Sequence, residues 1–421
     1  MLDIKFIKEN AGLIKEAAQK KRISFDLDAL LALEEKRKEA LVAFESLRAE
    51  QKKLSDEIPK ADPSSRAMLI EELKPLKEKV GEAEESYKNL LKEWQTHMLS
   101  VPNIPDVSVP DGEDESGNQE VRSWGEKKEF SFQPKNHIEI MESLDMADFE
   151  RGAEVAGFRG YYLKNDGASL SFAIWQYAKD FWMQRGFQFM IVPSLVRKQT
   201  LLGTGYLPGG EDDLYQTQDD DYLAGTGEVA TMSYFADQII PQPKFPIKVL
   251  AFSPCFRREA GAHSKDVKGL IRVHEFFKLE QVVLCEASHE NSVALHEEIN
   301  SNTEAFIQSL GIPFQTVVCC AGDTGLGQVK KYDINLWVPG EQTYREISSA
   351  SYFHDFQTRR LNIRYRDGEE KLRFAHSLNC TAIPTPRILV SLVENFQQAD
   401  GSIIIPEVLR PYMGKEIISK P

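Results

Sequence analysis

Two strand-like segments between Ile247 and Val283 carry many ionisable side chains. Apolar and polar residues alternate along both segments, and a period of two is typical of a strand with one buried face. We expect the first strand to span 247–256 and the second to begin at Leu270, after a long glycine-containing loop. Because a buried charge is costly unless it is paired, such strands either face solvent or line a ligand site. The ionisable residues are Arg257, Arg258, Glu259, Arg272, His274, Lys278 and Glu280.

These side chains suit a ligand with paired oxygens. An arginine fork matches a carboxylate or a phosphate, so Arg257 is a candidate clamp for either group. Glu280 lies eight residues beyond Arg272 on the same face of the predicted strand. A carboxylate placed there accepts a hydrogen bond from a small hydroxyl or pairs with an ammonium. The residues alone leave two interpretations open, a solvated strand face and a site for a charged small molecule.

The string 256–280 resembles motif 2 of class II aminoacyl-tRNA synthetases, and is most similar to that of the seryl-tRNA synthetases. The resemblance implies that Arg257 holds both the amino-acid carboxylate and the α-phosphate of ATP. It also implies that Glu259 accepts from the adenine amino group and that Phe276 stacks on the base. The ATP-binding residues implied by this motif are Arg257, Arg258, Glu259, Val273 and Phe276.

Two further stretches resemble parts of the same family that contact serine. The segment 223–228 is similar to the family's TxE loop, although a threonine and a glutamate in a glycine-rich loop are by themselves an ordinary turn. The segment 376–397 resembles motif 3, a strand that runs into an apolar helix. The serine-binding residues implied by the resemblance are Thr226, Gly227, Glu228, Arg257, Glu280, Asn379 and Thr381.

The same family resemblance implies which residues bind the phosphates of ATP. Arg387 opens the predicted motif 3 helix, where a guanidinium and a helix N-terminus together favour an anionic γ-phosphate. Arg257 and Arg387 are therefore the candidate catalytic residues. The run 331–351 also resembles the seryl family, and without that resemblance it would be a capping or turn segment. The resemblance implies that Glu346 and Ser349 hold Mg²⁺ on the triphosphate, as hard ligands for a hard cation, and that Glu346, Ile347, Ser348 and Ser349 all belong to the ATP site.

The chain departs from the family pattern in the TxE loop, at Ala224, Gly225 and Gly227, and in motifs 2 and 3. Glu275 and Phe277 stand where the family usually has Gln and Glu, which affects packing around the adenine. Cys380, Ala382 and Pro384 replace the usual Gly, Gly and Ala of motif 3. The loss of two glycines narrows the backbone near the nucleotide, so we expect an effect on nucleotide affinity.

The N-terminal quarter of the chain predicts helices. Residues 1–22 read as a short amphipathic helix, and two heptad seams follow on either side of the proline-containing turn 59–65. Seams of matched length predict an antiparallel helical hairpin, an arm about 50 Å long. Pro75 falls in the second helix, where it kinks the helix or delays its start. The seam residues are Leu30, Leu33, Arg37, Ala40, Phe44, Leu47, Gln51, Leu54 and Ile58, then Leu69, Leu73, Leu76, Val80, Ala83, Tyr87, Leu90, Trp94 and His97.

Such a hairpin has two interpretations. In an isolated fragment it would be a coiled coil for protein interaction, and its acidic and basic residues interleave without a continuous basic stripe. Seryl-tRNA synthetases of the bacterial type, however, carry an arm of this length at this place, which grips the long variable arm of their tRNA. The resemblance implies a reader of RNA shape that uses phosphates and backbone geometry. Basic residues gather locally at 36–38, Arg48, 52–53, Lys60 and Arg66.

After the proline-rich acidic connection 100–118, the sequence mixes helix and strand patterns with glycine punctuation, as expected of an α+β domain. The run 186–196 predicts a buried strand whose proline, Pro193, a central ladder would not tolerate. It resembles motif 1, whose proline lies at the dimer interface of class II synthetases. The resemblance therefore implies a homodimer.

Composition and net charge limit the classes of protein to which the chain can belong. The chain has 421 residues, of which 42% are hydrophobic and 28% charged, as in a globular protein of two or three domains. The formal net charge of −14 excludes a protein that coats nucleic acid, so RNA contact must rely on local basic patches. Five cysteines without CxxC spacing predict reduced buried thiols in the cytoplasm and no zinc site. We expect neither a targeting segment nor a membrane span.

The resemblance covers nearly the whole chain in the family's order. It implies an α+β protein, with an antiparallel β-sheet class II synthetase catalytic domain at 106–421. An N-terminal tRNA-binding domain with an antiparallel α-helical coiled-coil hairpin takes up 1–105. The implied reaction uses ATP to activate serine and charge the serine tRNA, leaving open the selenocysteine tRNA. The alternatives are a related ligase that charges a non-tRNA carrier, whose known relatives lack the arm, and a silent scaffold, which would be expected to lose Arg257, Glu280 or Arg387.

Overall fold

The structure is a computed structural model that describes residues 1–261 and 266–420. The chain forms two compact units. One comprises Leu2–Gln19 and Ile23–Pro102, and the other comprises Met1, Lys20–Arg22 and Asn103–Pro421. Among the described residues, no helix combines the length and apolar character needed to cross a bilayer.

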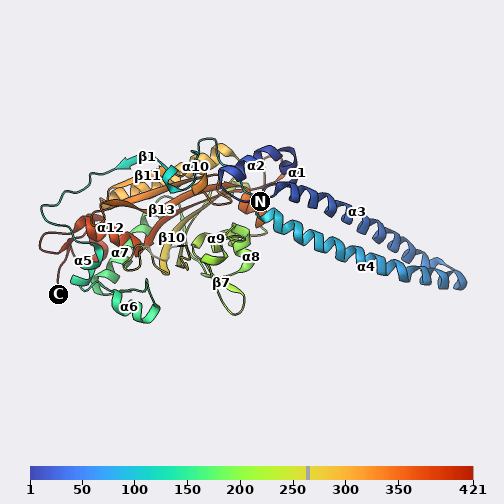
Figure 1. Cartoon of the computed structure of the whole chain (residues 1–421), viewed down its shortest axis with the longest axis horizontal. Coiled ribbons are helices and arrows are strands. Elements are labelled where there is room, and N and C mark those ends of the chain that lie inside the picture. The colour runs from blue at the N-terminus through green and yellow to red at the C-terminus, as the bar shows by residue number, and fades with distance from the viewer. Residues whose placement is uncertain (262–265, 421) are drawn as a thin grey trace. The chain divides into compact units, whose positions relative to one another are not determined.

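The helical unit contains the predicted hairpin (Figure 1). Its two long helices begin at aspartate caps, because the Asp26 carboxylate accepts from Ala29 N and the Asp62 carboxylate accepts from Ser64 N and Ser65 N. The expected single helix at 1–22 is two helices, α1 and α2, with a break at Asn10. The elements are α1 (Ile4–Glu9), α2 (Ala11–Lys20), α3 (Leu27–Glu57), a short 3₁₀ turn (Ile58–Lys60) and α4 (Pro63–Leu99).

The seam side chains hold α3 against α4. The ring of Phe44 stacks on Tyr87 with centroids 6.2 Å apart, and the guanidinium of Arg37 lies 4.9 Å from the ring centre of Trp94. Pro75 lies inside α4, which begins at Pro63, so the proline does not delay the helix. Buried seam residues are Leu30, Leu33, Leu73, Leu76 and Val80.

The larger unit is built on an eight-stranded sheet with the order β1-β11-β12-β13-β16-β10-β9-β4. Every neighbouring pair is antiparallel except β4 with β9, which confirms the predicted α+β class and the antiparallel catalytic sheet. In chain order the strands are β1 (Gln119–Trp124), β4 (Gln188–Ile191), β9 (Ile247–Phe256), β10 (Glu275–Cys285), β11 (Phe314–Val318), β12 (Lys330–Val338), β13 (Thr343–His354) and β16 (His376–Thr385).

Helix α10 (His289–Leu310) lies along one face of this sheet (Figure 1). Polar contacts fix it there, because Gln281 on β10 donates to Ile299 O at 3.0 Å and His296 contacts Ala350 O on β13 at 2.9 Å. The candidate site described below lies on the face of the central strands that α10 does not cover. Buried aromatic side chains, including Trp182 and Phe306, fill the core beneath α10.

Shorter elements complete this unit. Those that position the site are α7 (Asn165–Met183), β5 (Leu195–Arg197), α8 (Lys198–Thr204), β7 (Asp221–Leu223), α9 (Gly227–Tyr234), α11 (Phe356–Arg360) and α12 (Arg387–Phe396). The others are α5 (His137–Ser143), β2 (Ala147–Asp148), α6 (Phe149–Ala156), β3 (Tyr162–Leu163), β6 (Tyr215–Gln216), β8 (Ile239–Ile240), β14 (Arg364–Arg366), β15 (Leu372–Phe374), β17 (Ile403–Ile404), α13 (Arg410–Met413) and β18 (Ile417–Ile418).

Two strand predictions were wrong in part. Strand β10 begins at Glu275 rather than Leu270, because the backbone before it bonds elsewhere: Leu270 N donates to His137 and Ile271 O accepts from Arg387. Arg272 and Glu280 therefore do not share a strand. The run 186–196 is not a buried strand, since β4 is a sheet edge whose Ile191 is 75% exposed. Of the loop predicted before β10, residues 262–265 lie outside the described chain.

Candidate active site

One cavity collects residues from four separate parts of the sequence. Motif 2 supplies residues from both sides of its loop, the 346–349 run supplies two, and the end of β16 with the start of α12 supplies the rest. Among its lining residues are Arg257, Glu259, Val273, Phe276, Lys278, Glu346, Ile347, Thr381, Pro384 and Arg387. Most of the residues predicted for ATP thus lie together, although more than 120 positions separate the first from the last.

Two arginines line this cavity. Arg257 follows the last residue of β9, donates to Gly225 O at 3.4 Å and lies over the ring of Phe276, with 5.4 Å between Cζ and the ring centre. Arg387 opens α12 and donates to Ile271 O at 2.7 Å and Glu346 O at 3.1 Å. Burial lowers the pKa of Arg387. A desolvated guanidinium beside a helix N-terminus is a strong site for an oxyanion.

Glu259 has a cationic partner of its own. Its carboxylate pairs with the guanidinium of Arg272, and its backbone has a φ of 53°, in the left-handed region. Arg272 also lies 3.8 Å from Asp266. The pairing leaves the carboxylate fixed at the cavity wall, so its remaining lone pairs can accept from a ligand.

A bulge in β13 decides how Glu346 and Ser349 are placed. Residues three apart in a regular strand point to opposite faces. In the β12–β13 ladder Ile334 pairs with Ser348 and Asn335 with Glu346, so Ile347 is an extra residue. This extra residue brings Glu346 onto the face that Ser349 occupies. A carboxylate and a hydroxyl on one face fit a hard divalent cation.

A buried polar cluster adjoins the cavity. Lys278 on β10 donates to Thr226 Oγ1 at 2.8 Å and pairs with Glu280, while Thr226 lies 3.4 Å from the same carboxylate. Thr226 caps α9 by accepting from Glu228 N. A Cβ on Gly227 would come within 3.3 Å of Ser253 Oγ, so the glycine lets α9 approach β9 closely. The four polar side chains are all at least nine-tenths buried.

Glu228 differs from Glu280 in its partners. Its carboxylate accepts from the hydroxyl of Tyr206 at 3.0 Å and from the side-chain amide of Gln357 at 2.7 Å, both neutral groups. Burial, as the largest cause, raises the pKa of Glu228 to about 6. The sequence reasoning missed Tyr206 and Gln357, and it did not assign Lys278 to the site. Only Lys278 carried a signal, since it lies two residues before Glu280 on the same predicted strand face.

Some predicted residues lie apart from the cavity. Arg258 is exposed, with its backbone N–H bonded to Asp213 O. Ser348 points to the other face, where its hydroxyl donates to Thr381 O at 2.6 Å. Asn379 is partly exposed and lies two residues before Thr381 on the same face of β16. Ser349 shares the face of Glu346 without lining the cavity wall.

The departures from the family pattern mostly face away from the cavity. Cys380 is buried against Thr303 and Ser348 on the α10 side, and Ala382 is the extra residue of a bulge between β16 and β10. Pro384 does line the cavity. Glu275 and Phe277 point to the opposite face from Phe276.

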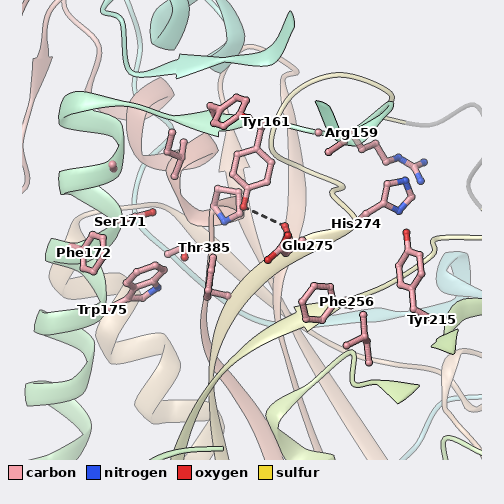
Figure 2. A pocket seen from close by; sticks show the side chains of 18 residues that line it. Arg159, Tyr161, Ser171, Phe172, Trp175, Tyr215, Phe256, His274, Glu275 and Thr385 are labelled. Carbon is pink, nitrogen blue, oxygen red and sulfur yellow. Dashed lines mark hydrogen bonds between the residues drawn. The ribbon is translucent and has the colours of Figure 1, made fainter. Parts of the chain in front are cut away.

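That opposite face holds a second cavity of about 480 Å³ (Figure 2). Aromatic side chains from α7 and β10 line it, among them Phe172, Trp175 and Phe277. The hydroxyl of Tyr161 reaches across it to donate to Glu275 O at 3.2 Å (Figure 2). Its walls are mainly apolar, and it contains none of the residues predicted for serine or ATP.

One group of possible metal ligands occurs among the described residues. The ligand atoms of Cys319, Asp323 and Asp333 lie within 4.8 Å of one another. The ammonium of Lys331 is 3.2 Å from Asp323 and 3.3 Å from Asp333, so a cation from the chain itself already balances these carboxylates. Cys320 turns away and contacts Asp114 O.

Known proteins resemble this chain along its whole length. Residues 1–105 match the family described as "Seryl-tRNA synthetase N-terminal domain", and residues 213–396 match "tRNA synthetase class II core domain (G, H, P, S and T)". The chain is 44% identical to a serine–tRNA ligase of Deinococcus radiodurans, with 100% of both proteins covered. The chain belongs to the seryl-tRNA synthetase family.

Solved structures of this family have the same fold. The seryl-tRNA synthetase of Pyrococcus horikoshii complexed with ATP superposes with a TM-score of 0.88 at 36% identity, covering 100% of both chains. The cytoplasmic enzyme of Naegleria fowleri in complex with AMP gives 0.85 at 32% identity, covering 100% of this chain and 99% of that one. These matches confirm two predictions from the sequence motifs: the seryl-tRNA synthetase family and the class II catalytic fold.

Proposed function

We propose that this chain is a serine–tRNA ligase. In the first step a serine carboxylate oxygen attacks the α-phosphorus of ATP and pyrophosphate leaves. In the second step a terminal ribose hydroxyl of tRNA attacks the seryl carbonyl and AMP leaves. The observation that supports this best is the meeting of Arg257, Glu346 and Arg387 at one cavity beside the buried cluster around Glu280.

Catalysis in the first step rests on position and charge. Arg257 lies where one guanidinium can contact the serine carboxylate and the α-phosphate together, which sets the attack geometry. Arg387 at the start of α12 faces the γ-phosphate, and Phe276 and Glu259 hold the adenine. Glu346 and Ser349 suit Mg²⁺, which when bound supplies charge neutralisation on the triphosphate. We propose no zinc in this reaction.

The polar cluster provides the serine site. Glu228 has only neutral partners, so it suits the ammonium of serine, whereas Glu280, already paired with Lys278, suits the serine hydroxyl. Thr226 and Thr381 flank Glu280, with Asn379 beside them and Gly227 forming the floor. A pocket that pairs buried polar groups with both the hydroxyl and the ammonium discriminates against alanine by leaving those groups unpaired.

The hairpin of α3 and α4 is the proposed tRNA reader, and we place the domain boundary at 105/106. The match of residues 1–105 to the family's N-terminal domain supports a tRNA over a carrier-protein substrate. We propose the cytoplasm as the location. Whether the selenocysteine tRNA is a second substrate depends on the same arm.

A homodimer is the proposed assembly, through α7, β4 and β5. These elements expose Phe172, Met183, Ile191 and Leu195, which are 68%, 51%, 75% and 53% accessible. An uncovered edge strand with apolar side chains is normally protected by a partner. In the described part of the chain, the buried atoms Ser171 Oγ, Trp175 Nε1 and Thr385 Oγ1 of the second cavity have no hydrogen-bond partner. A second copy that packs on α7, β4 and β5 would cover the exposed apolar side chains and the β4 edge.

The test is ATP–pyrophosphate exchange with each proteinogenic amino acid in turn. We expect exchange with serine only, dependent on Mg²⁺ and unaffected by a zinc-specific chelator. Exchange with another amino acid, or activity that a zinc chelator abolishes and zinc restores, contradicts the proposal. A chain that activates serine without charging tRNA would favour the carrier-ligase alternative.

A further inference from the structure

The proposed serine pocket contains a carboxylate, Glu228, that forms no ion pair with a described residue. Within the described residues, no lysine or arginine nitrogen lies within 4.0 Å of the Glu228 carboxylate, whereas Glu280 in the same pocket pairs with Lys278. Glu228 is 2% exposed. A buried carboxylate with this environment is protonated easily unless hydrogen-bond donors stabilise its charge. The donors around Glu228 therefore control whether it can receive an ammonium.

Tyr206 is one of these donors, and its position is fixed by the backbone. The residue before it, Gly205, has a φ of 91°, and a Cβ there would come 3.1 Å from the ring of Phe356. Tyr206 N donates to Leu201 O at 3.0 Å, which ties the residue to the end of α8. Tyr206 as a residue remains 38% exposed, while its hydroxyl points inward and donates to Glu228. Burial, followed by the charge of Glu228, raises the pKa of Tyr206, so its hydroxyl keeps its proton.

Gln357 is the other donor, and its orientation is also determined. Its amide nitrogen donates to Glu228 at 2.7 Å and to Thr204 O at 3.1 Å. Its amide oxygen accepts from the Ser377 hydroxyl at 2.7 Å. A reversed amide would place an oxygen against both Glu228 and Thr204 O, so the nitrogen must face the carboxylate. Among the described residues, each oxygen of Glu228 thus has one side-chain donor, and the hydroxyl of Tyr206 makes no other hydrogen bond.

We propose that Tyr206 is a positioning residue for serine recognition: its hydroxyl keeps Glu228 ionised and aimed at the serine ammonium. The inference rests on the proposed function, in which Glu228 receives that ammonium. Charged groups near Glu228 are Glu280 and Lys278 on β10, and Tyr206 itself is near Arg257 after β9. Removing the hydroxyl takes away a hydrogen bond that stabilises the charged carboxylate. We therefore expect serine binding to weaken most at pH values near the pKa of Glu228.

The experiment measures serine-dependent ATP–pyrophosphate exchange from about pH 5.5 to pH 8.5 for the wild type and Tyr206→Phe. For the wild type we expect the KM for serine to rise as pH falls through about 6. In Tyr206→Phe we expect this rise to begin at higher pH, with KM about tenfold higher near neutrality and a smaller difference at the alkaline end. The KM for ATP and kcat should stay within about twofold. The matched control is Tyr234→Phe, which removes an exposed tyrosine hydroxyl from the helix that carries Glu228.

The outcomes separate the two proposals. No serine exchange by the wild type contradicts the proposed function. Normal wild-type exchange with a serine KM that is flat across this pH range overturns the role of Tyr206, and this measurement requires no variant. An equal rise of KM at every pH in Tyr206→Phe, or a matching rise of the KM for ATP, also overturns it, because a structural defect alone would produce that result.

Discussion

At the scale of single residues, the proposed serine pocket combines two carboxylates in different electrostatic states. Lys278 pairs with Glu280, while the side chains that donate to Glu228 in the described part of the chain are both neutral. An unneutralised buried charge is unfavourable in the empty pocket and becomes favourable when a cationic substrate enters. We therefore expect the ionised Glu228 to favour serine binding at some cost to the stability of the free protein.

Glu228→Gln tests this cost. The pKa of Glu228 is raised from 4.5 to about 6, chiefly by burial, so its stabilising contribution is complete below pH 4.5 and is lost as pH rises through 6. The ionised group then costs about 2 kcal/mol, which a permanently neutral glutamine avoids. We expect Glu228→Gln to raise the thermal unfolding temperature near pH 8 but not near pH 4.5. A stability change that is equal at both pH values would contradict this prediction. We also expect serine activation by Glu228→Gln to fall sharply.

The residues that sequence could predict are those whose type already implies the chemistry. Arg257 and Arg387 sit in motif strings, and the structure places both at one cavity. Tyr206 and Gln357 could not be predicted, because they reach Glu228 from the turn after α8 and from α11, more than 20 and 120 positions away. Ser348 was assigned with its neighbours, but the bulge at Ile347 turns it to the other face.

At the scale of elements, heptad periodicity predicted α3 and α4 well because local pattern determines a helical hairpin. The strands were harder. The start of β10 depends on His137 and Arg387, which are distant in sequence, and the exposure of β4 depends on its place at a sheet edge. Apolar sequence alone does not distinguish an edge strand from a buried one.

A shortened hairpin tests the division of labour between the units. Replacing residues 48–76 with a tight turn trims α3 and α4 together and keeps the contacts of Phe44 with Tyr87 and of Arg37 with Trp94. We expect the variant to form seryl-adenylate at a normal rate, because every residue assigned to that step lies beyond residue 200. It should lose most tRNA charging, since Lys52, Lys53 and Lys60 are removed.

Both steps are measured on the same preparation, exchange for the first and aminoacylation for the second. Wild-type charging by the shortened chain would remove the hairpin from tRNA recognition. Loss of exchange in a folded variant would show that the chemistry depends on the hairpin.

At the scale of the whole molecule, the formal charge of −14 opposes binding of a polyanion. In the proposed function, serine activation involves small ligands in a partly buried cavity, whereas tRNA binding relies on exposed lysines and arginines. We therefore expect charging to weaken steeply between about 50 and 200 mM salt while exchange changes little, because counterion release accompanies phosphate contacts. Parallel loss of both activities would contradict separate sites. The measurement is initial rates of each reaction on one salt series, with magnesium held constant.

The extra residue at Ile347 also bears on how such a chain can change over generations. A substitution such as a change of Cys380, which lies on the far face of β16, leaves the backbone register intact. The number of residues between Glu346 and Ser349 is under a different constraint, because losing one would turn the carboxylate towards α10 and away from the hydroxyl. We therefore expect an insertion or deletion in this stretch to be tolerated less well than a substitution.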